Sequence, residues 1–69
     1  MINKEALEPY QQRVVEEREA LDVKIEALKK FFGTDTFLKI TANRQVLFRK
    51  QLAAMTEYSM ILGARISDF

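Results

Sequence analysis

The sequence contains neither cysteine nor histidine. Without cysteine there is no disulfide and no thiolate metal site, and without histidine the chain lacks the commonest metal ligand and general base. No stretch approaches the roughly 18 apolar residues of a membrane-spanning helix, and the first residues lack an apolar core of signal-peptide length. We therefore expect a soluble protein of the reducing cytoplasm.

The chain is also short, and its 69 residues form one domain at most. Domains of this size bury only about 60% of the surface that their unfolded chains expose, so many need a disulfide, a metal or oligomerisation for stability. The composition argues against the first two. Self-association remains, and we expect a homo-oligomer.

The net charge of +1 is far from the strongly basic balance of a dedicated nucleic-acid binder, so neither DNA nor RNA is expected as a partner. The charges are unevenly distributed. Residues 1–35 hold six basic and eight acidic side chains, whereas residues 36–69 hold five basic and two acidic ones. Two halves of opposite sign attract each other when antiparallel, and the second half can present cations to an anion.

Apolar residues recur at three- and four-residue steps along two long segments, 9–32 and 42–66, and predict two helices. The single proline and the two glycines leave both segments uninterrupted. Residues 3–8 can form a short leading helix, with Asn3 as its N-cap and Pro9 as its stop. Pro9 can equally be the first residue of the long helix, where its missing N–H costs nothing.

The connection between the two long helices is short. Gly33 is expected to end the first helix in the left-handed conformation that favours glycine. Residues 36–40 form a short helical turn, and Thr41 can cap the second long helix. A connection of this length makes the long helices run antiparallel. The predicted fold class is therefore all-α, with residues 1–69 forming a single antiparallel helical hairpin.

Each long helix has an apolar stripe, and the second helix has apolar residues beyond its stripe. The first stripe comprises Val14, Leu21, Ile25, Leu28 and Phe32, and the second comprises Phe48, Leu52, Met55, Ser59, Leu62, Ile66 and Phe69. Two further sides of the second helix carry Leu47, Ala54, Tyr58 and Ile61, and Val46, Ala53 and Met60. A hairpin offers only one neighbouring helix, so other copies must cover the rest. Arg18, the polar member of the first stripe, is an internal ion-pair partner or a device that sets the helix register.

No enzyme motif is present. The sequence has no Gly-rich phosphate loop, no nucleophile–base pair and no carboxylate–histidine ligand set. Glu16, Glu17 and Glu19 lie close together, but they are better explained as a solvated helix face than as paired catalytic carboxylates. We therefore expect a protein that is not an enzyme and that needs neither a metal nor another cofactor.

Two residues of the first long helix suit a planar anion. Tyr10 at the helix start can stack on a nucleobase, or it can cover the hairpin end as an apolar lid. Lys24, beside the stripe, can reach a phosphate at a subunit boundary, or it can extend its ammonium group into water. At 1.5 Å per residue the two lie about 21 Å apart, so one small ligand reaches both only where two chains pack antiparallel.

Arg65 is a further candidate. It follows the small residues Gly63 and Ala64, which allow close approach of another backbone or of a ligand. An arginine in the last helical turn also complements the helix dipole, and both roles remain open. Gln11, the neighbour of Tyr10, completes the set of candidate ligand-binding residues.

Three segments carry a resemblance to a known family. In the first helix they are Pro-Tyr-Gln-Gln-Arg-Val-Val-Glu-Glu (9–17) and Leu-Asp-Val-Lys-Ile-Glu-Ala-Leu (21–28). In the second helix the segment is Met-x-x-Tyr-Ser-x-x-Leu-x-x-Arg-Ile (55–66). Together they resemble the helical-hairpin domain shared by two phage proteins, the anti-CBASS cyclic-nucleotide sponge of the second type and the Thoeris anti-defence sponge of the first type. The resemblance covers about residues 9–69.

The resemblance implies a compact homo-hexamer without catalytic activity in the cytoplasm of the host bacterium. Such sponges bind cyclic oligonucleotide second messengers made by bacterial immune cyclases, among them cyclic GMP-AMP, and keep them from the effector without cleaving them. Their dinucleotide pockets lie between protomers and use an aromatic and a lysine, which Tyr10 and Lys24 match. Some members also hold cyclic trinucleotides in separate pockets near a three-fold axis, where Arg65 looks like the matching arginine.

The chain departs from the family in having a very short segment before Pro9, so contacts of a longer N-terminal helix are expected to be missing. It also carries no added domain like that of the Thoeris sponge, which argues against cyclic ADP-ribose derivatives as ligands. The alternative function is a structural oligomerisation or adaptor module that binds a protein partner through apolar surface. For that module, Leu52→Glu would abolish function, whereas changes at Tyr10 and Lys24 would not.

Overall fold

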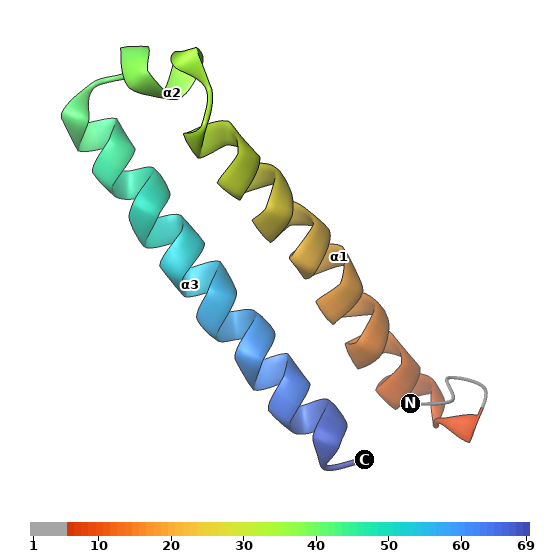
Figure 1. Cartoon of the computed structure of the whole chain (residues 1–69). Coiled ribbons are helices and arrows are strands. Elements are labelled where there is room, and N and C mark those ends of the chain that lie inside the picture. Colours follow the sequence, from red (N-terminus) through yellow and green to blue (C-terminus); the bar gives the residue numbers. More distant parts are fainter. Residues whose placement is uncertain (1–5) are drawn as a thin grey trace.

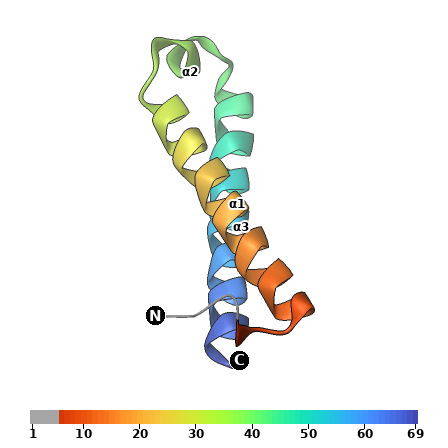
Figure 2. The same ribbon diagram turned by 90° about the vertical axis from the view of Figure 1, so that its right-hand side faces the viewer.

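The computed structural model describes residues 6–69, which contain three α-helices: α1 (Pro9–Phe32), α2 (Asp35–Lys39) and α3 (Ala42–Ser67) (Figure 1). α1 and α3 run antiparallel, and α2 lies at the end where the chain turns back. The turned view shows that the two long helices cross obliquely (Figure 2). No strand occurs in the described range. The protein is therefore an all-α helical hairpin, as predicted.

α1 begins at Pro9, which takes the first helical position, where a backbone N–H is not required. Glu8 is the N-cap, and its extended backbone (φ −63°, ψ 153°) leads the chain into the helix. The Glu8 N–H donates to Oε1 of Gln11 at 2.9 Å, so a side chain of the first turn secures the helix start.

The predicted leading helix over residues 3–8 does not reach Pro9. Glu8 is extended because the ring of a following proline disfavours helical backbone at the preceding residue. Of the two roles considered for Pro9, the structure shows the first residue of α1 and not the stop of an earlier helix. Asn3, expected as the N-cap of that leading helix, lies outside the described residues, as do all of residues 1–5.

The connection from α1 to α2 uses no left-handed residue, so the conformation predicted for Gly33 is wrong. Gly33 has φ −89° and ψ 6°, and its N–H donates to the Lys30 carbonyl at 3.1 Å, which tightens the last turn of α1. The side chain of Thr34 then accepts the N–H of Phe37 at 3.3 Å and caps α2. α2 therefore begins at Asp35, one residue earlier than predicted.

Four phenylalanines fix the closed end of the hairpin. Phe37 of α2 is only 3% exposed, and its ring centroid lies 5.7 Å from that of Phe31 and 4.8 Å from that of Phe32. Phe31 also contacts Phe48 of α3, at 5.3 Å between centroids. Ring contacts thus hold α2 on α1 and join α1 to α3, in the edge-to-face and tilted geometries that aromatic pairs favour. As predicted, Thr41 caps α3, and its hydroxyl accepts the N–H of the residue three positions on at 3.3 Å.

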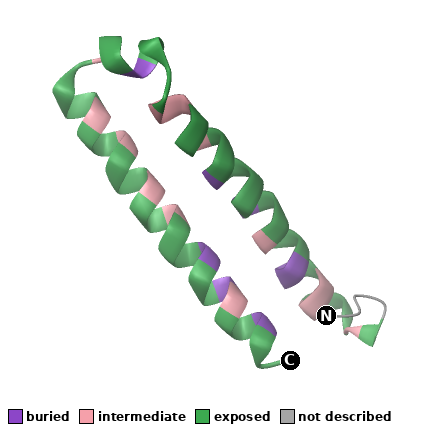
Figure 3. Ribbon diagram, in the orientation of Figure 1, coloured by how far each residue is buried: buried purple, intermediate pink, exposed green. Residues whose placement is uncertain are grey.

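The core lies between α1 and α3 (Figure 3). Its buried members are Val14, Val15, Leu21, Ile25, Leu62 and Ile66, with Leu7, Leu52 and Met55 packed against them. Leu62 is 0% exposed. The two predicted stripes therefore face each other, and Val15 joins them from the edge of the first.

A polar link crosses the interface between the helices. Nε of Arg18 donates to Oγ of Ser59 at 3.3 Å, and the Ser59 hydroxyl donates to Oδ1 of Asp22 at 2.5 Å. Nε of Arg18 also lies 3.9 Å from Oδ2 of Asp22, so the ion pair predicted for Arg18 is present, although its side chain is 40% exposed rather than internal. The guanidinium rests on Gly63, where a Cβ would approach Nη1 to 2.6 Å. Gly63 therefore makes room for a side chain of its own chain.

Large apolar side chains remain exposed outside the interface. On α3 they are Val46, Leu47, Tyr58, Met60 and Ile61, with exposed fractions between 42% and 67%. Val23 on α1 and Leu38 on α2 are exposed to 69% and 72%. The apolar excess predicted for the second long helix is therefore present, and residues 6–69 of one chain do not cover it.

Leu62→Ala should lower the free energy of unfolding by about 2–5 kcal/mol, because it leaves a cavity where no solvent reaches. Urea denaturation at fixed protein concentration measures the change. Leu38→Ala is the matched control at the exposed tip, and it should shift stability by no more than about 0.5 kcal/mol. Equal losses in the two variants would contradict the assignment of the core.

Ser59→Ala should lower the free energy of unfolding by about 1 kcal/mol, because it leaves Arg18 and Asp22 without the hydroxyl that joins them. Thr56→Ala is the control on the same helix, since its hydroxyl donates to the Leu52 carbonyl of α3 itself. The thermal midpoints of both variants show whether losing a hydroxyl that joins two helices destabilises the protein more than losing a hydroxyl that bonds within one helix. A larger loss in the Thr56 variant would argue against the link.

Candidate functional site

Tyr10 lies at the open end of the hairpin, in the first turn of α1 and beside the end of α3 (Figure 1). Its side chain is 60% exposed. The Tyr10 ring meets the ring of Phe69 edge to face, with 6.4 Å between centroids and 74° between planes. Phe69 is itself 39% exposed. Tyr10 therefore covers part of the open end and remains accessible to a ligand.

Gln11 has a structural task at this end. Its Oε1 accepts the N–H of Glu8 and so holds the turn from which Tyr10 projects. The next residue, Gln12, fixes the same turn from the other side, because its side-chain amide donates to the Leu7 carbonyl at 2.9 Å. Gln11 therefore affects the candidate site by holding the turn that positions Tyr10. A direct contact of Gln11 with a ligand stays a prediction.

Lys24 lies in the middle of α1 with its side chain exposed. It makes no hydrogen bond or ion pair with residues 6–69, whereas Lys29, on the same helix, lies 3.4 Å from a carboxylate oxygen of Glu26. α1 is continuous between Tyr10 and Lys24, so the two stay about 21 Å apart along its axis and do not meet on one chain. Lys24 is a cation available to an anion from outside the hairpin.

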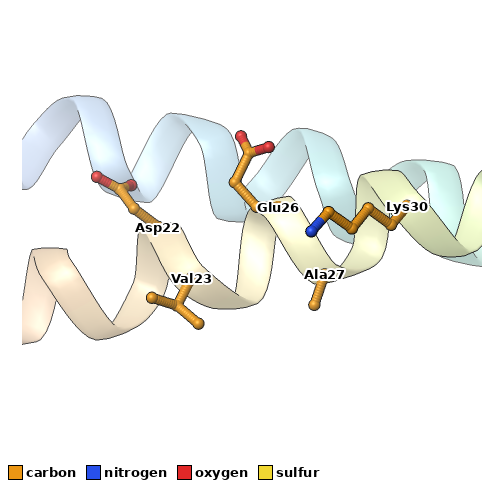
Figure 4. A pocket seen from close by; sticks show the side chains of 5 residues that line it. All are labelled: Asp22, Val23, Glu26, Ala27 and Lys30. Carbon is orange, nitrogen blue, oxygen red and sulfur yellow. The ribbon is translucent and has the colours of Figure 1, made fainter.

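The middle of α1 also bears a shallow depression, which Lys24 does not line (Figure 4). Its lining residues are Asp22, Val23, Glu26, Ala27 and Lys30. Val23 and Ala27 point away from α3, and the lining also includes the carboxylates of Asp22 and Glu26 and the ammonium group of Lys30. Two negative charges against one positive charge repel a phosphate, so the depression by itself suits an apolar contact rather than an anionic ligand.

Arg65 lies in the last turn of α3 and is exposed. It precedes Phe69 by four residues, about one helical turn, so it belongs to the same end of the hairpin as Tyr10. The space expected beside Arg65 at Gly63 is filled by the Arg18 guanidinium rather than by a ligand. Tyr10, Gln11 and Arg65 thus share the open end, and Lys24 stands apart from them.

Phe69 lies beside the candidate site, although the sequence pattern did not indicate a role for it there. Its spacing extends the apolar stripe of α3 and predicts a core residue, yet its ring lies outside the core cluster and packs on Tyr10. No pattern within α3 could signal this contact, because it depends on which part of α1 lies beside the helix end.

The described part of the chain contains neither a metal-binding cluster nor a membrane-spanning helix. Among residues 6–69, no three acidic side chains gather closely enough to hold a metal ion. In the same range, no helix has the length and the apolar character needed to cross a lipid bilayer.

Comparison with known proteins identifies the family. A sequence model of the Sequestin family matches residues 8–68. The chain is 42% identical over 60 residues to an uncharacterized 7.5 kDa protein from the denB–rIIB intergenic region of Enterobacteria phage T4, and the match spans 87% of this chain and 94% of that protein. No solved structure gives a significant match. With the family model covering nearly its whole length, the chain belongs to the Sequestin family.

Proposed function

We propose that this protein is a phage anti-defence sponge. It binds cyclic dinucleotides such as cyclic GMP-AMP, and in a second site cyclic trinucleotides, and it withholds them uncleaved from CBASS effectors in the cytoplasm of the infected bacterium. The family name, which suggests sequestration, and the phage relative both support this proposal. The observation that carries it is the pairing on α1 of an exposed aromatic ring, Tyr10, with a cation, Lys24, that has no partner among residues 6–69.

The positions of these two residues define how two chains would share a ligand. Fourteen residues of an α-helix turn by close to four full turns, so Tyr10 and Lys24 lie within about 40° of each other around α1. Glu17 stands midway between them. A two-fold axis beside Glu17, relating two antiparallel α1 helices, places Tyr10 of one chain opposite Lys24 of the other. Each pair of chains then forms two equivalent sites.

The charges beside this axis are compatible with such a pair. Two Glu17 carboxylates would approach each other across the axis and repel. Arg13 lies one helical turn before Glu17 on an exposed side of α1, and in an antiparallel pair it comes within one turn of the Glu17 of the other chain. Each arginine can therefore neutralise a carboxylate across the axis.

Within a shared site the two residues would act on different parts of the ligand. The Tyr10 ring stacks on a nucleobase, an interaction that contributes about 1–3 kcal/mol per base. The Lys24 ammonium group neutralises a phosphate. Since the chain has no histidine or cysteine and no motif for a nucleophile with its base, we propose that it binds its ligand without chemistry.

Oligomerisation is part of the same proposal. The exposed apolar side chains of α3 flank its core stripe on two sides, and further copies of the hairpin would cover them. A homo-hexamer, the assembly that the resemblance implies, gives each α3 several neighbours. Arg65, near the end of α3, is the proposed contact for a cyclic trinucleotide.

Tyr10→Ala and Lys24→Gln should each weaken binding of cyclic GMP-AMP at least tenfold, because one removes the stacking surface and the other the phosphate's counter-charge. Tyr10→Phe, which keeps the ring, and Lys29→Gln, which removes another exposed lysine of α1, should bind like the wild type. Isothermal calorimetry measures the affinities.

Native mass spectrometry with cyclic di- and trinucleotides and a cyclic ADP-ribose derivative gives protomers and ligands per assembly. The bound compound should be recovered with unchanged mass. Arg65→Gln should reduce only trinucleotide binding. An assembly that takes up none of these compounds would refute the sponge, and one that takes up only the cyclic ADP-ribose derivative would refute the assigned messenger class.

Glu17→Cys should form a disulfide-linked dimer under mild oxidation, since it is the only cysteine in the variant and two copies would meet across the axis. Non-reducing electrophoresis at low protein concentration reads the product. Lys39→Cys, on exposed α2, is the control and should dimerise slowly. Equal rates for the two variants would contradict the antiparallel pairing of α1.

A protein-binding adaptor is the second candidate function, and the exposed apolar residues of α3 favour it. From the sequence, Leu52→Glu would test this idea, but Leu52 packs against the core, where the substitution would also disturb folding. Met60 is 67% exposed and is therefore the better position for a Glu substitution. If the adaptor reading is right, Met60→Glu abolishes protection of a phage from a defended host, while Tyr10→Ala and Lys24→Gln preserve it.

A further inference from the structure

We infer that Phe69 is a positioning residue of the nucleotide site, because its ring fixes the ring of Tyr10 in the orientation that receives a base. This inference rests on the proposed function. It adds a residue that follows the end of α3 to a dinucleotide site that otherwise draws on α1 alone, and it makes the geometry of that site depend on how the two helices are packed.

The first support is the contact itself. The two rings meet at 6.4 Å and 74°, within the range where the positive edge of one ring attracts the negative face of the other. Neither ring belongs to the core cluster, and both remain well exposed. A core role would bury these rings, whereas here they contact each other and keep surface open to a ligand.

The second support is the way Phe69 is held. Its N–H donates to the Ile66 carbonyl at 3.1 Å, and the N–H of Asp68 donates to the Arg65 carbonyl at the same distance. Ile66 is buried in the core. The Phe69 backbone is therefore tied through the last turn of α3 to the interface between the helices, and its ring projects from a fixed position.

Tyr10 likewise has a fixed backbone, and its exposed side chain needs a neighbour to hold one rotamer. Pro9 and Gln11 hold the first turn of α1, so the Tyr10 Cα is well placed. An exposed aromatic side chain in water samples several rotamers, and immobilising one on binding costs the equivalent of roughly 2- to 13-fold in affinity. The contact with Phe69 selects one arrangement before the ligand arrives.

The experiment compares Phe69→Leu, Phe69→Tyr and the wild type for calorimetric binding of cyclic GMP-AMP. Phe69→Leu keeps apolar volume but loses the ring, and it should bind about 3- to 10-fold more weakly. Phe69→Tyr restores the ring and should bind like the wild type. Assembly mass and thermal midpoint, measured on each variant, should stay within error of each other.

Two further measurements separate positioning from direct contact. In the free wild type, NMR should show Tyr10 ring protons shifted by the Phe69 ring current, and Phe69→Leu should abolish that shift. In a Tyr10→Leu background, Phe69→Leu should cause no further loss of affinity, because a positioning residue acts only through Tyr10.

The outcomes are distinct. Wild-type affinity in Phe69→Leu, with Tyr10→Ala still impaired, would overturn the role of Phe69 and leave the sponge intact. A loss that adds to that of Tyr10→Leu would overturn positioning, because Phe69 would then contact the ligand independently. Unshifted Tyr10 protons in the wild type would overturn it as well. No binding by the wild type would overturn both the proposed function and this inference.

Discussion

A helix with apolar residues on three of its sides needs more than one neighbour, and a hairpin supplies only one. α1 covers the stripe of α3 that contains the fully buried Leu62, and it leaves Leu47 and Met60 on the two flanks of that stripe in water. Exposed apolar surface on a chain this small drives association. The proposed assembly, the shared ligand sites and the antiparallel pairing of α1 all depend on this unsatisfied surface.

The packing of α1 on α3 also decides what the open end presents. Arg18, Ser59 and Asp22 link the helices at one level, and Gly63 accommodates the guanidinium, so the helices cannot slide past each other by a turn without breaking that link. The same register sets Phe69 beside Tyr10. A polar cluster between the helices thus helps to set the surroundings of an aromatic ring about two to three turns away.

The proposed function divides the work between the two helices. α1 carries the residues that would touch a cyclic dinucleotide, Tyr10 and Lys24, and two copies of α1 complete a site. α3 carries most of the apolar surface that would hold copies together and, through Phe69, would hold the Tyr10 ring. Binding and assembly are then linked, since a variant that cannot assemble also lacks a complete site.

Local spacing in the sequence determined the two long helices, their facing stripes, the cap at Thr41 and the apolar excess of α3, because each depends on residues within a few positions of one another. The candidates Tyr10 and Lys24 were likewise visible from residue type and place. Only the tertiary structure decided the seating of Arg18 on Gly63 and the contact of Phe69 with Tyr10. These depend on the register and crossing of two helices, which bring together residues far apart in the chain, and no periodicity within one helix encodes that register.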